Sequence, residues 1–324
     1  MRTRSDVAHL LWVLALVWPG TACATASGSG PGISVETKAD RDLLDAAKTG
    51  DLEKARSAIA DGANLKPETS PPSPLRPPPP SRPSPALPLM FAANKGYTDI
   101  VKLLLDKGVP VDIRDEKSGA TAMMAAAGGG KIDTVRLLLD RGANPNARSL
   151  ADWSALMYAA GFGATHFPVT ALLVERGAEV NAQNNLGNAP LQLAAHNSGD
   201  TDIVVFLLDK GSKIDAQARD GWTALIDAID TNHVAAAKIL IERGANVNLA
   251  AQSGWTALMA AAFKGHADVA AMLIAKGADV NAKARPVVDG RPAPKPTTAL
   301  EVARDLKHVE VVKLLELAGA KEQQ

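Results

Sequence analysis

The chain has 324 residues, of which 46% are hydrophobic and only 4% aromatic, so its packing must depend on aliphatic side chains. It carries 35 basic and 35 acidic side chains, and its formal net charge is zero at pH 7. This balance excludes a general electrostatic attraction to nucleic acid. The single cysteine, Cys23, excludes a framework of intramolecular disulfides.

The first 24 residues have the pattern of a secretory signal peptide. Two arginines precede an apolar run from Leu10 to Trp18. As a helix this run would cover about 14 Å, which is too short for a hydrocarbon core of about 30 Å. Small residues then offer two cleavage sites, Ala22-Cys23-Ala24 and Ala24-Thr25-Ala26. We therefore expect an exported, periplasmic bacterial protein in which residues 25–38 form a flexible linker.

Cys23 has two interpretations that the sequence leaves open. A cysteine at this place becomes the lipid-bearing first residue of a bacterial lipoprotein, and the Ser- and Gly-rich segment after it resembles a tether. The residue three positions before it is Gly20, however, where such signals usually carry Leu. The alternative is an incidental cysteine that is removed with the leader. Contact with a membrane is expected only through a lipid on Cys23.

A glycine after an apolar helical run returns at intervals of 33 to 35 residues along most of the chain. The glycines with this spacing are Gly108, Gly142, Gly177, Gly211, Gly244 and Gly277. A fixed period of this length indicates a stack of similar supersecondary units, so we expect a solenoid. Such stacks usually bind macromolecules along an extended surface.

A second motif comes into register when the repeats are aligned by this glycine. It reads Trp-Ser-Ala-Leu-Met at 153–157, Trp-Thr-Ala-Leu-Ile at 222–226 and Trp-Thr-Ala-Leu-Met at 255–259. The motif resembles the Thr-Pro-Leu-His signature of ankyrin repeats, and the glycine end resembles their Leu-Leu-Leu-x-x-Gly-Ala. The resemblance extends over about residues 39–320. It implies an all-α repeat solenoid, an ankyrin-repeat stack of about eight helix-turn-helix units with β-hairpin connections, within a domain at 39–324.

One repeat shows why these residues form such a unit. Thr256 can cap a short inner helix by accepting a backbone hydrogen bond, and Gly265 ends that helix. A second helix begins near Ala267, and Gly277 permits the positive φ that stops it. At the two ends of the stack, charged residues predict terminal units with one polar face.

Two insertions lengthen the glycine interval, to 46 residues after Gly62 and to 42 after Gly277. The first, residues 66–88, is rich in proline and predicts an extended polyproline-type loop. It could dock to an aromatic-lined groove, or it could be a tolerated loop expansion. The second insertion is a loop at residues 285–296.

The resemblance implies that the three tryptophans lie on hairpin arms facing the concave groove, where partners bind. Trp153, Trp222 and Trp255 would then form an aromatic stripe, with Asn188 in the repeat between. The alternative is that each tryptophan packs against its own hairpin. The same reasoning places further candidate binding residues on the hairpins or the ends of the inner helices: Leu150, Gly161, Phe162, Asn185, Leu186, Arg219, Asp220, Asp230, Thr231, Gln252, Ser253, Phe263 and Lys264.

No catalytic pattern accompanies these repeats. The signature histidine of the family is replaced by Met124, Met157 and Met259 in three repeats, where we expect methionine to pack between layers. His233 and His266 lie one repeat apart, which is too far for one metal site. We find no protease, hydrolase or phosphate-loop motif and expect neither a cofactor nor an enzymatic reaction.

The sequence therefore predicts a non-catalytic, monomeric adaptor of the cell envelope that binds a partner protein through the concave hairpin and inner-helix face. Two alternatives remain. One is an inhibitor or immunity protein that covers the active site of a toxin or enzyme. The other is an envelope scaffold that protects against stress, which a lipid on Cys23 would favour.

Overall fold

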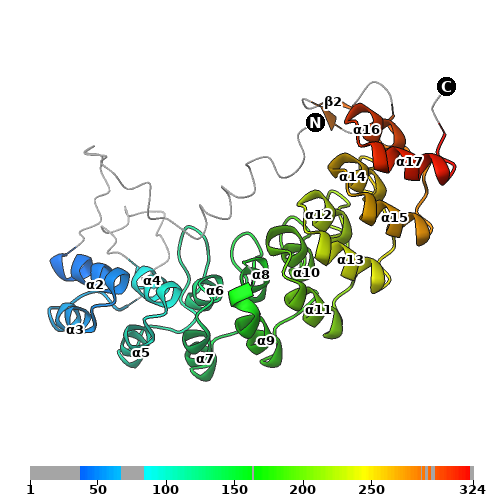
Figure 1. Ribbon diagram of the computed structural model, residues 1–324. Helices are drawn as coiled ribbons and strands as arrows, with labels where there is room; N and C mark the ends of the chain where they lie inside the picture. Colours follow the sequence, from blue (N-terminus) through cyan, green and yellow to red (C-terminus); the bar gives the residue numbers. More distant parts are fainter. Residues whose placement is uncertain are drawn as a thin grey trace, which may run out of the picture. The chain divides into compact units, whose positions relative to one another are not determined.

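The computed structural model describes residues 37–66, 84–162, 164–285, 287–288, 291–292 and 296–321. The expected signal peptide with Cys23 and residues 67–83 of the proline-rich insertion lie outside these residues. Within them the chain forms pairs of short antiparallel helices in a repeating order (Figure 1). The helices are α2 (Lys38–Thr49), α3 (Leu52–Ala60), α4 (Ala86–Lys95), α5 (Thr98–Asp106), α6 (Ala122–Gly128), α7 (Ile132–Asp140), α8 (Ala155–Gly161), η1 (Ala164–His166), α9 (Phe167–Glu175), α10 (Pro190–Leu193), η2 (Ala194–Ser198), α11 (Thr201–Asp209), α12 (Ala224–Asp230), α13 (Val234–Glu242), α14 (Ala257–Lys264), α15 (Ala267–Ala275), α16 (Ala299–Asp305) and α17 (Val309–Leu317).

The described residues fall into two compact units. The first, here called the N-terminal unit, holds residues 37–66, 84–159 and 168–179, and the C-terminal unit holds the others. In the N-terminal unit the inner helices α2, α4 and α6 contact one another in sequence, and so do the outer helices α3, α5 and α7. In the C-terminal unit α10, α12, α14 and α16 form the inner row, and α11, α13, α15 and α17 form the outer row.

The closing glycines have the conformation that the period predicts. All eight, from Gly62 to Gly319, have φ between +84° and +89°, which ends each outer helix. Inner helices α2, α6, α12, α14 and α16 begin at threonine caps, as expected: the Thr256 hydroxyl accepts a hydrogen bond from the Met259 N–H at 3.3 Å. Both signals were readable from the sequence because each depends on a single residue and its own backbone.

The core consists of thin aliphatic layers between neighbouring helix pairs. The methionines in place of the family histidine are almost fully buried, with exposed fractions of 2% for Met124, 0% for Met157 and 1% for Met259. The expectation that they pack between layers is therefore confirmed. None of the helices in the described ranges is long and apolar enough to cross a bilayer.

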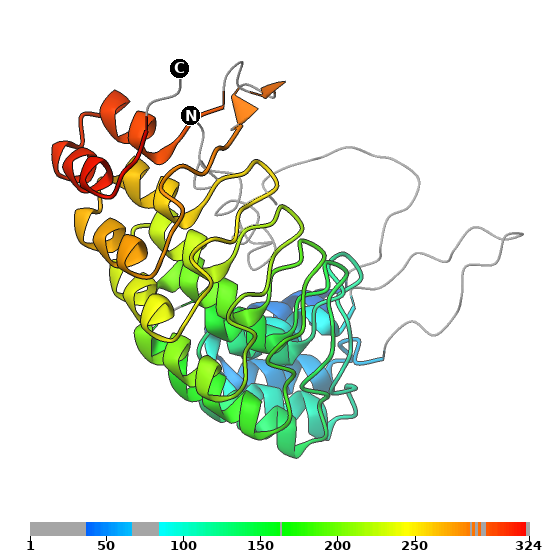
Figure 2. The ribbon, with the colours of Figure 1, turned by 90° about the vertical axis from the view of Figure 1, so that its right-hand side faces the viewer.

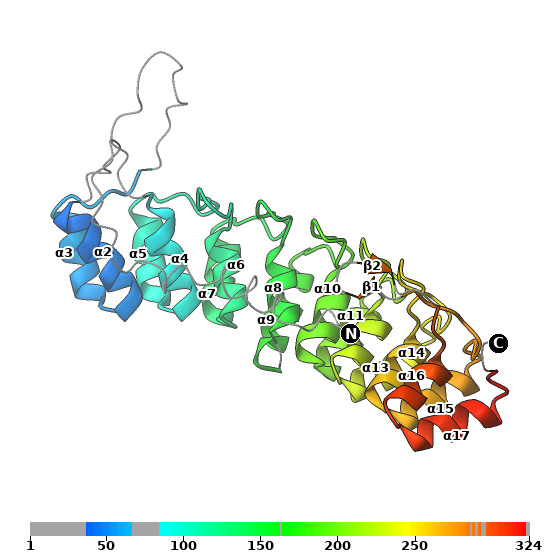
Figure 3. The same ribbon diagram turned by 90° about the horizontal axis from the view of Figure 1, so that it is seen from above.

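Connections between the helix pairs leave the helices on one side in each unit (Figures 2 and 3). They were expected to be β-hairpins, but most of the described connections turn without regular strands. Three of them carry an isolated antiparallel bridge: Gln217–Thr223, Ala250–Thr256 and Ala284–Thr297. The segment expected to be a plain loop at 285–296 instead contains two short antiparallel strands, β1 (Val287–Val288) and β2 (Arg291–Pro292). Within the described ranges, regular strand pairing is found only between β1 and β2.

One boundary and the polarity of the last repeat differ from the sequence-based expectation. Helix α4 begins at Ala86, inside the range expected for the first insertion, because Pro88 in a first helical turn gives up no intrahelical hydrogen bond. The last repeat is also less polar than a terminal unit should be. Leu306, Val309 and Leu317 are 43%, 59% and 87% exposed on it.

Candidate protein-binding face

Backbone hydrogen bonds join several hairpin tips to the tip before them. In the C-terminal unit Arg219 N donates to Leu186 O at 2.9 Å, and Gln252 N donates to Asp220 O at 2.8 Å. Arg285 N donates to Ser253 O at 2.7 Å. The tips therefore form a row with a fixed backbone in this unit.

The N-terminal unit contains the same bond at one place. Leu150 N donates to Ser118 O at 2.9 Å, and the Leu150 side chain is 73% exposed.

Glycine makes these close approaches between tips feasible. A Cβ on Gly187, where φ is +81°, would lie 2.7 Å from the Arg219 nitrogen.

Several predicted binding residues lie on this row with their side chains in solvent. Arg219 and Gln252 are exposed, and Leu186 is 39% exposed. Asp220, Asn185 and Ser253 are half-buried. The row thus presents varied side chains on tips that backbone hydrogen bonds join to one another.

Two of the three tryptophans do not have the exposure that a binding stripe requires. Trp153 and Trp255 are each 7% exposed. The Trp153 ring packs 5.0 Å from the Tyr158 ring, and the Trp255 ring packs edge-on at 6.3 Å from the Phe263 ring. The prediction of exposed aromatic tips is wrong for both, because each ring gains more by covering its own inner helix than by remaining in water.

The other two residues at the repeat position of Trp153 and Trp255 are Trp222 and Asn188. Trp222 is half-buried, and its carbonyl accepts a hydrogen bond from Gln192 Nε2 at 3.0 Å. Asn188 was expected at an exposed tip but is 6% exposed, and its N–H donates to Asn184 Oδ1 at 3.0 Å. Of these four residues only Trp222 retains surface for a partner.

The ends of the inner helices provide the remaining predicted residues. Phe162, Thr231, Phe263 and Lys264 are half-buried, whereas Gly161 is buried. The Phe162 ring lies 6.0 Å from the ring of His166. Asp230, expected on the exposed surface, is only 1% exposed.

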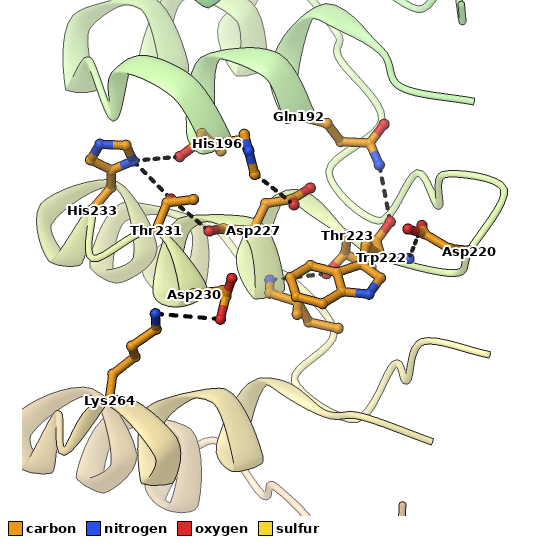
Figure 4. A network of polar contacts seen from close by, with 12 residues as sticks. Gln192, His196, Asp220, Trp222, Thr223, Asp227, Asp230, Thr231, His233 and Lys264 are labelled. Atoms are coloured by element: carbon orange, nitrogen blue, oxygen red, sulfur yellow. Dashed lines mark hydrogen bonds and ion pairs between the residues drawn. The ribbon is translucent and has the colours of Figure 1, made fainter. Parts of the chain in front are cut away.

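A polar row within the C-terminal unit crosses the inner helices at this level (Figure 4). His196 Nδ1 on η2 lies 3.1 Å from Asp227 Oδ1 on α12. One turn further along α12, Asp230 Oδ1 lies 3.6 Å from Lys264 Nζ on α14. Both carboxylates are 1% exposed, so two acidic groups are buried within one short helix.

Asp230 is the less well satisfied of the two acids. Neither of its carboxylate oxygens has a hydrogen-bond donor. Burial raises the pKa of Asp230 above its ordinary value, and the nearby charge of Asp227 raises it further, although Lys264 and His196 act in the opposite direction. The pKa of Asp230 is raised because the loss of hydration outweighs the attraction of Lys264.

Asp230 and Lys264 were among the binding residues predicted from the sequence, but the polar row that contains them was not predicted. The repeat register contained a usable signal, because the place of Asp227 is taken by Ala125, Tyr158, Leu193 and Ala260 in other repeats. An acid at a position that is elsewhere apolar is unusual for a buried helix. Within the described ranges no group of three or more His, Cys, Asp or Glu side chains is arranged to hold a metal ion.

Histidines at the starts of outer helices bind the preceding repeat. His233 Nδ1 lies 2.9 Å from the Ala195 carbonyl oxygen, and His308 Nε2 lies 3.1 Å from that of Phe263. His266 Nε2, at the same repeat position, is buried without a hydrogen-bond partner. Burial lowers the pKa of His266, which favours its neutral form.

Comparison with known families agrees with this repeat geometry. The family model described as ankyrin repeats (3 copies) matches residues 43–149, 148–218 and 191–284, which is well over half of the chain. The chain belongs to the ankyrin-repeat family. A search of curated proteins finds no match in sequence.

Solved ankyrin-repeat structures resemble this ankyrin-repeat chain as well. One is the crystal structure of the human ASB11 ankyrin repeat domain, which is 25% identical, with a TM-score of 0.62. The match covers 73% of the present chain and 99% of the ASB11 chain. Ankyrin repeats are in general modules for protein–protein interaction.

Proposed function

We propose that this ankyrin-repeat protein is a non-catalytic adaptor that binds another protein through the hairpin tips and inner-helix ends of its C-terminal unit. The observation that carries the proposal is the row of tips at Leu186, Arg219 and Gln252. Their backbones are fixed by bonds from tip to tip, while their side chains reach solvent. A surface that is already ordered loses little conformational entropy when a partner binds.

Export to the bacterial envelope belongs to the same proposal. It is supported by the basic start, the apolar run at Leu10–Trp18 and the small residues around Cys23. The mass of the mature N-terminus tests it. A chain that begins at a lipid-modified Cys23 supports a membrane anchor, and a chain cleaved after Ala24 or Ala26 supports a soluble periplasmic form. A chain that retains Met1 contradicts export.

Protein binding is tested by affinity capture from envelope extracts with a variant of the tips. We expect the double variant Arg219→Ala, Gln252→Ala to lose the partners that the wild-type protein captures. The matched control is Glu242→Ala on the outer helix α13, whose side chain is equally exposed. Equal capture by all three proteins contradicts the proposed face. Far-ultraviolet circular dichroism establishes that both variants remain folded.

A further inference from the structure

The buried carboxylate of Asp230 in the C-terminal unit requires an explanation. It is 1% exposed, and neither oxygen accepts a hydrogen bond. A buried acceptor without a donor destabilises the fold, and a charged one does so more strongly. Groups that break this rule in native proteins are concentrated at functional sites.

Lys264 is the cation that lies against Asp230. Its ammonium is 3.6 Å from Asp230 Oδ1, beyond ordinary hydrogen-bond distance, and 5.4 Å from the centre of the Phe263 ring. Figure 4 shows the two side chains directed toward one another from α12 and α14. The Lys264 side chain is 21% exposed, so it can move into water without unfolding either helix. A carboxylate and an aromatic ring thus both lie near one partly exposed ammonium.

This arrangement has the chemistry of a site for a cationic side chain. A carboxylate binds ammonium and guanidinium groups through charge-assisted hydrogen bonds, and an aromatic face adds cation–π attraction. The site lies at the C-terminal ends of α12 and α14, which belong to the proposed binding face. The other titratable groups that face Asp230 are Asp227 on the same helix and His196 on η2. Neither supplies a hydrogen bond to Asp230.

We propose that Asp230 is the anchor for a lysine or arginine side chain of the bound protein, which replaces Lys264 when the complex forms. Lys264 holds this place in the free protein through an ion pair at 3.6 Å, longer than a normal hydrogen bond. A partner cation that approaches closer supplies the missing donors. This inference rests on the proposed protein-binding function and specifies the chemistry of the partner.

The test removes the resident cation and offers one from solution. The probe is N-acetyl-lysine methylamide, and its binding is followed by chemical shifts in two-dimensional NMR and by the melting temperature. In Lys264→Ala the probe is expected to bind at least about tenfold more tightly than in the wild-type protein, because it no longer competes with an attached ammonium. The double variant Lys264→Ala, Asp230→Asn is expected to lose this gain.

The matched control is Lys238→Ala, which removes a lysine from the exposed ion pair between Lys238 and Asp268. It should bind the probe no better than the wild-type protein. If Lys264→Ala binds no more tightly than this control, or if Asp230→Asn leaves the gain intact, the anchor is refuted. Should Lys264→Ala unfold, the probe is titrated into wild-type protein and Asp230→Asn instead. Saturable shifts at α12 and α14 are then expected in the wild type alone, and equal shifts in both refute the anchor.

The anchor and the proposed function fail in different ways. If captured partners bind Asp230→Asn as well as wild type but are lost from the tip variant, protein binding holds and the anchor is wrong. If tip variants retain every partner, the proposed face itself is wrong.

Discussion

Replacing Asp230 by asparagine should stabilise the protein at neutral pH. The substitution keeps the shape of the side chain and removes a charge that is 1% exposed and lacks hydrogen-bond donors. A buried neutral acceptor without a partner costs about 1–3 kcal/mol and a charged one costs more, and asparagine removes only this additional cost of the charge. The loss of the Lys264 ion pair offsets part of this gain, although Lys264 can turn toward water. We expect a net gain of about 1 kcal/mol, or a rise of about 2–4 °C in melting temperature for a protein of this size.

The pH dependence of this effect has a definite sign. The pKa of Asp230 is raised above its unfolded value of 3.8, chiefly by burial, so the folded state binds the proton more tightly than the unfolded state. The protonated carboxyl therefore favours folding below pH 3.8, and this advantage is lost as the pH rises through the folded pKa. The stability difference between Asp230→Asn and wild type should be full at pH 7 and should shrink as the pH falls toward 3.8.

Urea denaturation of both proteins between pH 4 and pH 8, followed by circular dichroism, measures this difference. Asp268→Asn is the matched control, because a hydrogen bond from Lys238 lowers the pKa of the exposed Asp268. The stabilisation by ionised Asp268 is present above pH 3.8 and is lost as the pH falls. The Asp268→Asn variant should therefore have a free energy of unfolding that is lower at pH 7, by no more than about 0.5 kcal/mol. The reasoning is refuted if Asp230→Asn is less stable than wild type at pH 7, since the ion pair with Lys264 would then outweigh the cost of burial.

Three further predictions concern the repeats themselves. Gly211→Ala should cost about 1 kcal/mol in urea denaturation, because its φ of +85° is strained for alanine while no atom lies within 4 Å of the new Cβ. Gly187→Ala should cost at least about 1 kcal/mol more, because its Cβ meets a backbone nitrogen at 2.7 Å, and equal losses would contradict this. Trp255→Ala should destabilise by about 3–5 kcal/mol and the half-buried Trp222→Ala by clearly less, whereas a binding-only role for both rings predicts small losses in each. Burial raises the pKa of Tyr158 to about 12, so the absorbance of its phenolate should appear only near pH 12. The free energy of unfolding should fall as the pH rises from 10 toward 12. Ionisation of Tyr158 near pH 10 would exclude this.

The fold was predictable from the sequence where one residue determines the local backbone. Glycines such as Gly277 require positive φ, and threonines such as Thr256 supply a cap, so their period specifies the helix pairs. The candidate site was predictable only in part. Exposed Arg219 and Gln252 lie where the family pattern places them.

What the sequence could not provide was the direction and burial of individual side chains. Trp255 sits at a hairpin arm, yet its ring lies over its own helix against Phe263 and is removed from solvent. Asp230 is close to the end of a helix, but Lys264 of the next repeat covers it. Both outcomes depend on contacts between particular side chains, Trp255 with Phe263 and Asp230 with Lys264, and the repeat motif does not specify these contacts.

The central claim is that the tips of the C-terminal unit are the protein-binding face. Photo-crosslinking tests it most directly, with a benzophenone amino acid placed at Arg219, at Gln252 or, as the control, at Glu242 on the outer helix. We predict that both tip positions form covalent adducts with the same protein in envelope extracts and that position 242 does not. Adducts from position 242 alone, or of equal yield from all three positions, would contradict the account.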